Sequence, residues 1–252
     1  MSDNYSIGKG IVYFNKKVNG VYEGERDLGN CPEFSYSIPV EELDHYSSRG
    51  GLKTKDKKII SQVSPAVSFT LDELTPDNVA LLTLSDIEEI TQVAATITGE
   101  TKPGYKGKRI ILENRNIDPA TVVVKEGATT LVLDTDYTID LIKKDDKIGR
   151  ILILETATIT ADGVDLIIDY DTLGATYKKL KGVAQTIIEG SLRFVSDNPV
   201  GNQQELLIHK ASITPAGDTA MIGDDWSTLG FAGEILKDEV DHPNSPYFDI
   251  YM

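Results

Sequence analysis

Residues 67–71 are Val67-Ser68-Phe69-Thr70-Leu71, and residues 34–40 are Phe34-Ser35-Tyr36-Ser37-Ile38-Pro39-Val40. In both stretches, apolar or aromatic side chains alternate with other residues at a period of two. Successive side chains of an extended strand point to opposite faces, so this alternation predicts two strands that each bury one face. These stretches decide the fold class, because an amphipathic helix would need a period near 3.6.

The same alternation recurs along the chain, and Gly, Asn, Asp and Pro separate the runs. Further strands are expected at residues 10–15, 57–63, 89–98, 182–194, 205–213 and 230–236. One short helix is also expected. Thr75 is a good N-cap, Pro76 fits the first helical position, and an apolar face follows as far as Ser85. The predicted fold class is therefore mainly β with one short helix.

Residues 101–176 differ in their sequence pattern from the rest of the chain. They begin with a Gly- and Pro-rich stretch and continue with short β-branched runs separated by turn residues, which is typical of a small all-β, Ig-like module. The segment carries 10 basic and 13 acidic residues, whereas the rest carries 15 basic and 27 acidic residues. We therefore expect one β domain made of residues 1–100 and 177–252, interrupted by a β-rich module at 101–176.

The composition limits the possible functions. The chain has 252 residues, a formal net charge of −15 and 40% hydrophobic residues, which is enough for a buried core. Binding to duplex nucleic acid needs clustered Lys and Arg, so the acidic balance argues against that activity. The balance is compatible with a conduit that repels passing nucleic acid, although acidic surfaces more commonly serve solubility alone.

Cys31 is the only cysteine, so no intramolecular disulfide and no cysteine-based zinc site is expected. Nothing next to Cys31 would activate it as a nucleophile. The first residues lack a basic stretch followed by an apolar run, which predicts no secretory signal. No apolar segment approaches the length of about 20 residues that a membrane span needs. A cytoplasm-like compartment, without a membrane partner, is therefore expected before assembly.

Candidate catalytic and metal-binding residues are few. His45, His209 and His242 lack metal-ligand spacing, and no Gly-x-Ser-x-Gly elbow is present. A triad assembled in space stays open, but structural or surface histidines are the simpler interpretation. The acidic runs at 134–136 and 145–146 lack the spacing of a calcium loop, so solvated turn carboxylates are the simpler interpretation there. We therefore expect that the protein is not an enzyme and that it binds neither a cofactor nor a metal.

One charged segment stands out. Residues 47–58 carry five basic residues and one acid, contain a Gly-Gly pair and lie between two predicted strands, so we expect a long mobile loop. The loop is either simply solvated, or it is an arm that meets an acidic surface on another copy. Such a head-to-tail contact closes into rings or extends into filaments. The candidate contact residues are Arg49, Lys53, Lys55, Lys57 and Lys58.

Several stretches occur in a distinctive order along the chain. They are Asp27-Leu28-Gly29-Asn30-Cys31-Pro32-Glu33-Phe34, Glu41-Glu42-Leu43-Asp44-His45-Tyr46-Ser47-Ser48, Gly51-Leu52-Lys53-Thr54-Lys55-Asp56-Lys57, Phe69-Thr70-Leu71-Asp72-Glu73-Leu74-Thr75-Pro76-Asp77-Asn78 and Glu189-Gly190-Ser191-Leu192-Arg193-Phe194, followed by residues 207–215. This order resembles the major tail tube proteins of long-tailed (siphovirus-type) bacteriophages. The resemblance covers roughly residues 1–100 and 180–252, and the middle module departs from the shortest members of that family.

The resemblance implies a β-sandwich or barrel-like core with a helix on its flank. It implies hexameric rings stacked into a tube that conducts DNA during ejection without sequence-specific binding. The segment 47–58 would match the arm that reaches the neighbouring ring, and the module 101–176 would lie on the outer surface. The implied partners are copies of the chain itself and the tape-measure, tail terminator and distal tail proteins. The implied location is the tail of the virion, assembled in the host cytoplasm.

A second hypothesis comes from a different class of protein. The middle module could be a carbohydrate- or receptor-binding unit of a virion surface, with Trp226 and some of the eleven tyrosines as stacking groups. Core packing is the simpler use of most of these aromatic residues.

Overall fold

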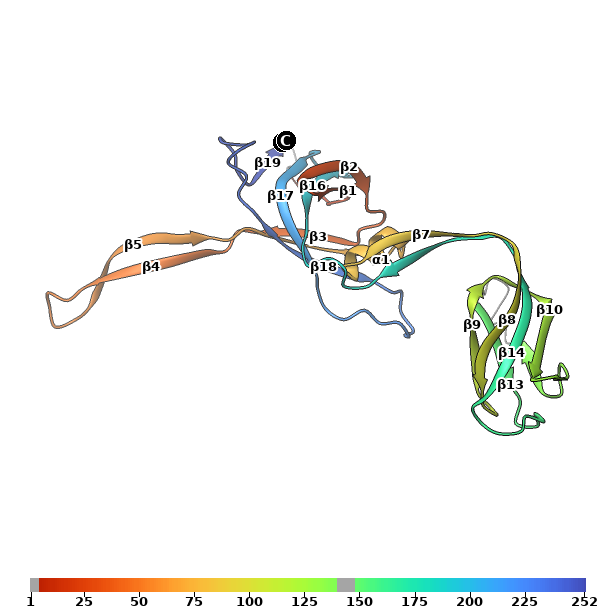
Figure 1. Ribbon diagram of the computed structural model, residues 1–252. Coiled ribbons are helices and arrows are strands. Elements are labelled where there is room, and N and C mark those ends of the chain that lie inside the picture. Colours follow the sequence, from red (N-terminus) through yellow and green to blue (C-terminus); the bar gives the residue numbers. More distant parts are fainter. Residues whose placement is uncertain (1–4, 140–147) are drawn as a thin grey trace. The chain divides into compact units, whose positions relative to one another are not determined.

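The computed structural model describes residues 5–139 and 148–252. Contacts between residues divide the chain into two compact units: unit 1 is Met1–Glu88 with Leu180–Met252, and unit 2 is Glu89–Lys179. Strands are the main regular elements of both units (Figure 1), and α1 is the one helix among the described residues. The mainly β class with one short helix is therefore confirmed.

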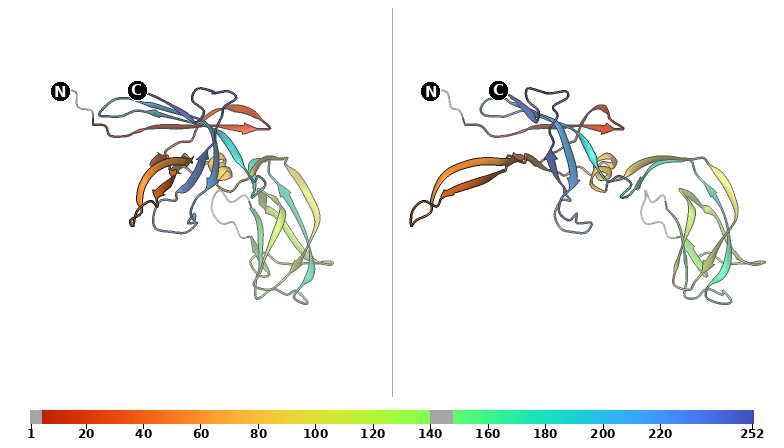
Figure 2. Two further views of the ribbon diagram at one scale, coloured as in Figure 1. Left: turned by 90° about the vertical axis from the view of Figure 1, so that its left-hand side faces the viewer. Right: turned by 60° about the vertical axis from the view of Figure 1, so that its left-hand side comes forward.

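Unit 1 is built on one large antiparallel sheet with the strand order β2-β1-β16-β17-β18-β6-β3, and β19 pairs with part of β17. Its strands are β1 (Gly10–Val18), β2 (Val21–Asp27), β3 (Glu33–Ser37), β6 (Ala66–Leu71), β16 (Ile188–Ser196), β17 (Glu205–Pro215), β18 (Leu229–Ile235) and β19 (Phe248–Tyr251). In Figure 2 the N-terminal strands lie beside C-terminal ones. The segments before and after unit 2 thus share one sheet.

The core of unit 1 lies on one face of this sheet. Val67, Phe69 and Leu71 of β6 are at most 2% exposed, whereas Ser68 between them faces solvent. The rings of Phe69 and Phe231 stack with 4.9 Å between their centroids. Burying an apolar side chain of this size contributes roughly 1.5–3 kcal/mol, so the period-two pattern determines which face of each strand packs inward.

The helix α1 (Pro76–Leu82) is held by its cap and by a buried asparagine. The backbone N–H of Asn78 donates to Oγ1 of Thr75, as the N-cap pattern predicts. The Asn78 side chain is fully buried, donates to the carbonyl oxygen of Leu28 at 2.9 Å and accepts from Nη1 of Arg26 at 2.8 Å. These bonds fix the helix against the β2–β3 connection, because a buried amide is stable only when it is hydrogen-bonded. No described helix is long and apolar enough to cross a membrane.

Unit 2 contains a four-stranded sheet, β11-β10-β14-β8, and a three-stranded sheet, β12-β13-β9. Side chains from both sheets form one core, in which Val124, Ile151 and Leu166 are fully buried. The strands are β8 (Ala95–Gly104), β9 (Arg109–Arg115), β10 (Ile117–Glu126), β11 (Thr129–Thr130), β12 (Tyr137–Ile139), β13 (Ile148–Ile153) and β14 (Val164–Thr172). Unit 2 is thus a small all-β unit with its own core.

The chain passes between the units through two paired strands, β7 (Asp86–Gln92) and β15 (Ala175–Lys181). The sequence placed the module boundaries at residues 101 and 176, whereas the contacts place them at Glu89 and Lys179. The earlier start of unit 2 has a simple cause. β8 pairs with β14 from Ala95↔Thr172 to Gly104↔Val164, and therefore belongs to unit 2 along its whole length.

Three predicted strands have other limits. The run 34–40 is split into β3 and β4 (Val40–Ser47) at Pro39, which has no N–H for a sheet hydrogen bond. The run 89–98 is split between β7 and β8 after Gln92, whose side chain bonds the backbone of Arg115 instead. The predicted strand 182–194 begins only at Ile188.

The large sheet does not close on itself. β2 and β3 lie at its two ends, and among the described residues each has a neighbouring strand on one side only. The barrel-like alternative is therefore wrong for the single chain, whose sheet is open. An open end presents unpaired N–H and C=O groups that can pair with another strand.

Candidate assembly surfaces

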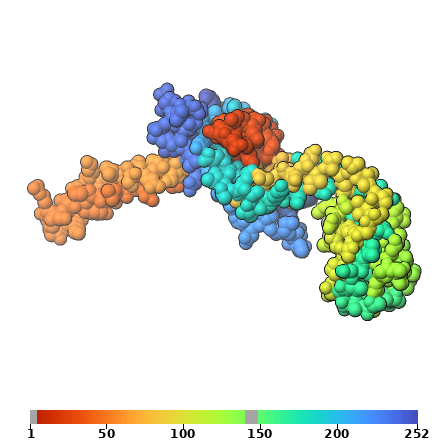
Figure 3. Space-filling model, in the orientation of Figure 1, coloured from red at the N-terminus to blue at the C-terminus, as the bar shows by residue number. Residues whose placement is uncertain are grey.

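Residues 40–63 form a two-stranded hairpin that projects from unit 1. β4 pairs antiparallel with β5 (Thr54–Val63), from Val40↔Val63 to Ser47↔Thr54. Among the described strands, these two pair only with each other. In Figure 3 the hairpin is a narrow orange projection, and all but one of its strand residues are exposed to solvent.

The prediction of a long mobile loop at 47–58 is wrong. Only residues 48–53 connect the strands, and Lys55, Lys57 and Lys58 lie on β5. β5 pairs with β4 along its backbone, and β4 also places acidic side chains beside the lysines of β5. Asp44 lies opposite Lys58, and Nζ of Lys55 lies 2.5 Å from Oδ1 of the same aspartate.

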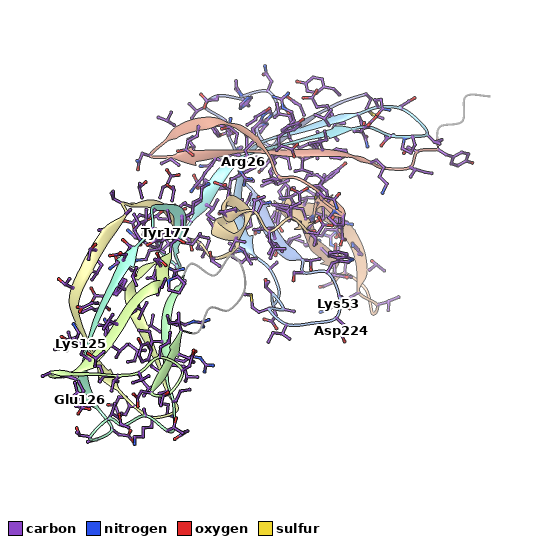
Figure 4. The ribbon with its side chains drawn as sticks, turned by 90° about the vertical axis from the view of Figure 1, so that its right-hand side faces the viewer. Arg26, Lys53, Lys125, Glu126, Tyr177 and Asp224 are labelled. Carbon is purple, nitrogen blue, oxygen red and sulfur yellow. The ribbon has the colours of Figure 1, made fainter. Side chains whose placement is uncertain are left out.

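The candidate contact residues thus fall into two groups. Lys55 and Lys58 are paired within the hairpin, Lys55 with Asp44 and Lys58 with Glu42. The hydrogen bond with Asp44 raises the pKa of Lys55, so the ammonium group of Lys55 stays charged and paired within the hairpin. The other three, Arg49, Lys53 and Lys57, form no ion pair with any described residue. Arg49 and Lys53 lie in the tip of the hairpin, residues 48–53, and Lys53 is labelled in Figure 4.

The hairpin also exposes large apolar side chains. The charge pattern of the sequence did not indicate them. Leu43 and Ile59 lie opposite each other and are 62% and 49% exposed. Ile60 is exposed as well, and Leu52 at the tip is 77% exposed. A two-stranded ribbon is marginally stable in water, and large apolar side chains exposed along it are candidates for burial against a partner.

The two ends of the large sheet are a second surface of this kind. β2 is exposed along most of its length, including Val21 and Tyr22. β3 exposes Tyr36 at the other end. The open ends provide main-chain groups and apolar side chains together, which suits strand addition.

The loop between β17 and β18, residues 216–228, is a third surface, and the sequence reasoning missed it as a contact. Met221, Ile222 and Trp226 are 88%, 96% and 94% exposed. Residues 217–228, all of which are described, make no hydrogen bond within the chain. The signal in the sequence was a tryptophan in a segment without strand periodicity, between Asp225 and Ser227.

A shallow cavity of about 640 Å³ lies between β1, β2 and α1. Its charged lining alternates in sign, with Lys16 and Arg26 near Glu25 and Asp77. Arg26 is tied to Asn78, and burial lowers its pKa. No nucleophile with an adjacent base lines this cavity, so its chemistry favours ionic contacts with a neighbouring surface.

The structure brings together two of the three histidines. The rings of His209 and His242 stack with 3.7 Å between their centroids, and Nδ1 of His242 lies 3.1 Å from Oδ2 of Asp238. His45 lies elsewhere, on the hairpin, beside Asp56. Among residues 5–139 and 148–252, no group of three or more His, Cys, Asp or Glu side chains could hold a metal ion.

Cys31 and Asp136 have structural surroundings. Burial raises the pKa of the Cys31 thiol to about 11, so its reactive thiolate form is scarce. Asp136 accepts hydrogen bonds from the N–H of Val132 and from both the N–H and Oγ1 of Thr158, and the first of these contributes most to its lowered pKa. This carboxylate therefore closes a turn in unit 2. The run 145–146 lies outside the described residues.

Unit 2 offers few stacking groups for a sugar. Tyr137 and Tyr170 are buried in its core, and Arg115 lies over the ring of Tyr177. Tyr105 is the exposed tyrosine in the part of this unit that the structure describes. Figure 4 shows Tyr177, Lys125 and Glu126 on this unit.

The fold and these surfaces define a mainly β protein with an open sheet, a projecting hairpin and an inserted β unit. Residues 5–250 match the family described as "Protein of unknown function UCP028589", and the chain belongs to that family. No curated protein matches the sequence.

Proposed function

We propose that this chain is a virion structural protein that forms stacked, hexameric rings of a phage tail tube, through which DNA passes during ejection. The resemblance of residues 1–100 and 180–252 to siphovirus tail tube proteins supports this proposal. The tape-measure, tail terminator and distal tail proteins are its further proposed partners, and the tail of the virion is its proposed location.

The observation that carries the proposal is the projecting hairpin β4–β5. It exposes Leu43, Leu52, Ile59 and Ile60, and large exposed apolar side chains on a ribbon that is marginally stable in water indicate an interaction site. A neighbouring subunit that covers the hairpin would bury these side chains. The open sheet ends β2 and β3 would pair with strands of other copies in the same way.

The polar face of the large sheet suits the wall of a conduit. Ser35, Ser68, Ser212 and Glu234 line a hollow on this sheet, together with apolar groups such as Tyr36 and Ala66. Oγ of Ser35 and Oγ of Ser68 are 2.9 Å apart and hydrogen-bond to each other. Hydroxyl groups that satisfy each other and a carboxylate that repels phosphate would let DNA slide past without adhering.

Electron microscopy of the concentrated protein tests the proposal. We expect negatively stained rings and tubes with a central channel, and sedimentation velocity should show large assemblies that form with rising concentration. A compact monomer at every concentration would overturn the proposal.

A hairpin deletion sharpens the test. Val40 and Val63 are paired, so an Asn-Gly turn can replace residues 41–62 without straining the remaining strands. We expect this variant to keep the circular dichroism spectrum of unit 1 and to form no tubes. The variant Lys108→Glu, on the surface of unit 2, is the matched control and should assemble normally.

A further inference from the structure

The tip of the hairpin and the loop 216–228 have complementary chemistry. The tip, residues 48–53, carries Arg49 and Lys53 around Leu52 and has no acidic residue. The loop carries Asp218, Asp224 and Asp225 and has no basic residue. Each segment thus has one sign of charge beside exposed apolar side chains.

Among the residues that the structure describes, no charged side chain of either segment has a charged or hydrogen-bonding partner. Arg49 and Lys53 form no ion pair with a described residue, and residues 217–228 make no hydrogen bond within the described part of the chain. Trp226 is 94% exposed and Leu52 is 77% exposed. Trp and Arg are the residues that most often dominate binding energy at interfaces, and here an exposed Trp226 lies beside the exposed Ile222 and Met221.

We propose that the loop 216–228 is the surface that receives the hairpin tip of a second copy of this chain. Leu52 packs against Trp226 and Ile222, while Arg49 and Lys53 pair with Asp224 and Asp225. This inference rests on the proposed assembly function and names the surface that the hairpin contacts.

The ion pairs and the apolar contact have different roles in this interface. Ion pairs at an exposed rim are screened by solvent and contribute little affinity, so the charges set orientation and association rate. The burial of Trp226 against Leu52 supplies most of the affinity. Because the tip and the loop are different surfaces, the contact is head-to-tail, and repetition of it closes a ring or extends a filament.

Charge reversal tests the contact on the full chain. Arg49→Glu with Lys53→Glu should raise the concentration needed for half-assembly by about tenfold or more, and Asp224→Lys with Asp225→Lys should do the same. The chain with all four substitutions should recover assembly, because the signs are again opposite. Trp226→Ala should raise the concentration about 30-fold, the effect of losing a central aromatic contact. Lys108→Glu is the charge-reversal control.

A cysteine pair gives a second readout. In a Cys31→Ala background, Gly51→Cys with Gly223→Cys should form disulfide-linked oligomers under mild oxidation, since these open positions adjoin Leu52 and Ile222 and leave the proposed contact itself intact. Gly51→Cys with Lys108→Cys is the control and should not form them. Circular dichroism checks that each variant is folded.

The outcomes separate this inference from the proposed function. If the unmodified protein assembles but the loop variants assemble equally well, the loop receives nothing and the inference is overturned, while the proposed function stands. If each pair of reversals blocks assembly but the fourfold variant does not recover, the two segments do not meet, which also overturns it. If the unmodified protein never assembles, the proposed function fails first.

Discussion

His209 is a buried residue at the point where the C-terminal segment folds back on the large sheet. Its side chain is almost fully buried, its ring stacks on His242, and its Nε2 lies 3.5 Å from Oδ2 of Asp249 without a hydrogen bond. Burial lowers the pKa of His209 below its ordinary value of 6.5, and the neighbouring His242 acts in the same direction. The folded chain therefore favours the neutral ring.

This lowered pKa predicts a pH dependence of stability. The unfolded state binds a proton at His209 near pH 6.5, whereas the folded state does so only at lower pH, so folding stability is present above 6.5 and falls as the pH drops below it. Urea unfolding at pH 7.5 and pH 5.5 measures the difference. We expect the His209→Gln variant to lose part of that difference, because its side chain at this position takes up no proton on unfolding. An unchanged pH profile in His209→Gln would contradict the assignment.

At the level of elements, the hairpin β4–β5 differs from the sheet that carries it. Its ion pairs, such as Lys58 with Glu42, are partly exposed and screened by solvent, so they contribute little to stability. No described residue of either strand belongs to the core cluster of unit 1, whereas Ile208 of β17 is fully buried in it. The hairpin is therefore held by its own hydrogen bonds and little else.

Hydrogen exchange should reveal this difference. In the unassembled protein, we expect amides of residues 41–62 to exchange within seconds, because a two-stranded ribbon opens locally, while amides of β17 stay protected for hours. In assembled material the hairpin amides should become protected too. If the hairpin amides of the monomer exchanged as slowly as those of β17, the hairpin would be stable by itself. It would then not need to be buried by a neighbouring subunit.

At the scale of the whole molecule, each unit has a core of its own. The core cluster of unit 1 contains no residue of unit 2, and the reverse also holds for the described residues. The points at which the chain leaves unit 1 and returns to it are close together, since Nζ of Lys181 lies 3.3 Å from Oε2 of Glu88. Unit 2 can therefore be removed without pulling unit 1 apart.

A deletion of residues 89–179, bridged by a short Gly-Ser linker from Glu88 to Leu180, should leave unit 1 folded. We expect one cooperative thermal transition in this variant and two in the full chain. If the module lies on the outside of a tube, the variant also forms tubes, and electron micrographs show them thinner. Loss of the cooperative transition would show that the fold of unit 1 depends on unit 2.

Much of the fold could be predicted from the sequence. The strands around Val67–Leu71 follow the pattern of buried and exposed side chains, and Thr75 with Pro76 marks the start of the helix correctly. The hairpin could not be predicted in the same way. The one-sided charge of residues 47–58 indicates a loop, and only the register with β4 shows that Asp44 and Glu42 neutralise Lys55 and Lys58.

By itself, the amino-acid sequence determined that this protein is mainly β, with one short helix and a change of texture in the middle. Local periodicity and capping are short-range properties, which neighbouring residues record directly. Only the tertiary structure decided that the sheet stays open, that His209 meets His242, and that Trp226 and Leu52 remain uncovered. These properties depend on contacts between residues far apart in the chain, and no local pattern specifies which distant surfaces meet.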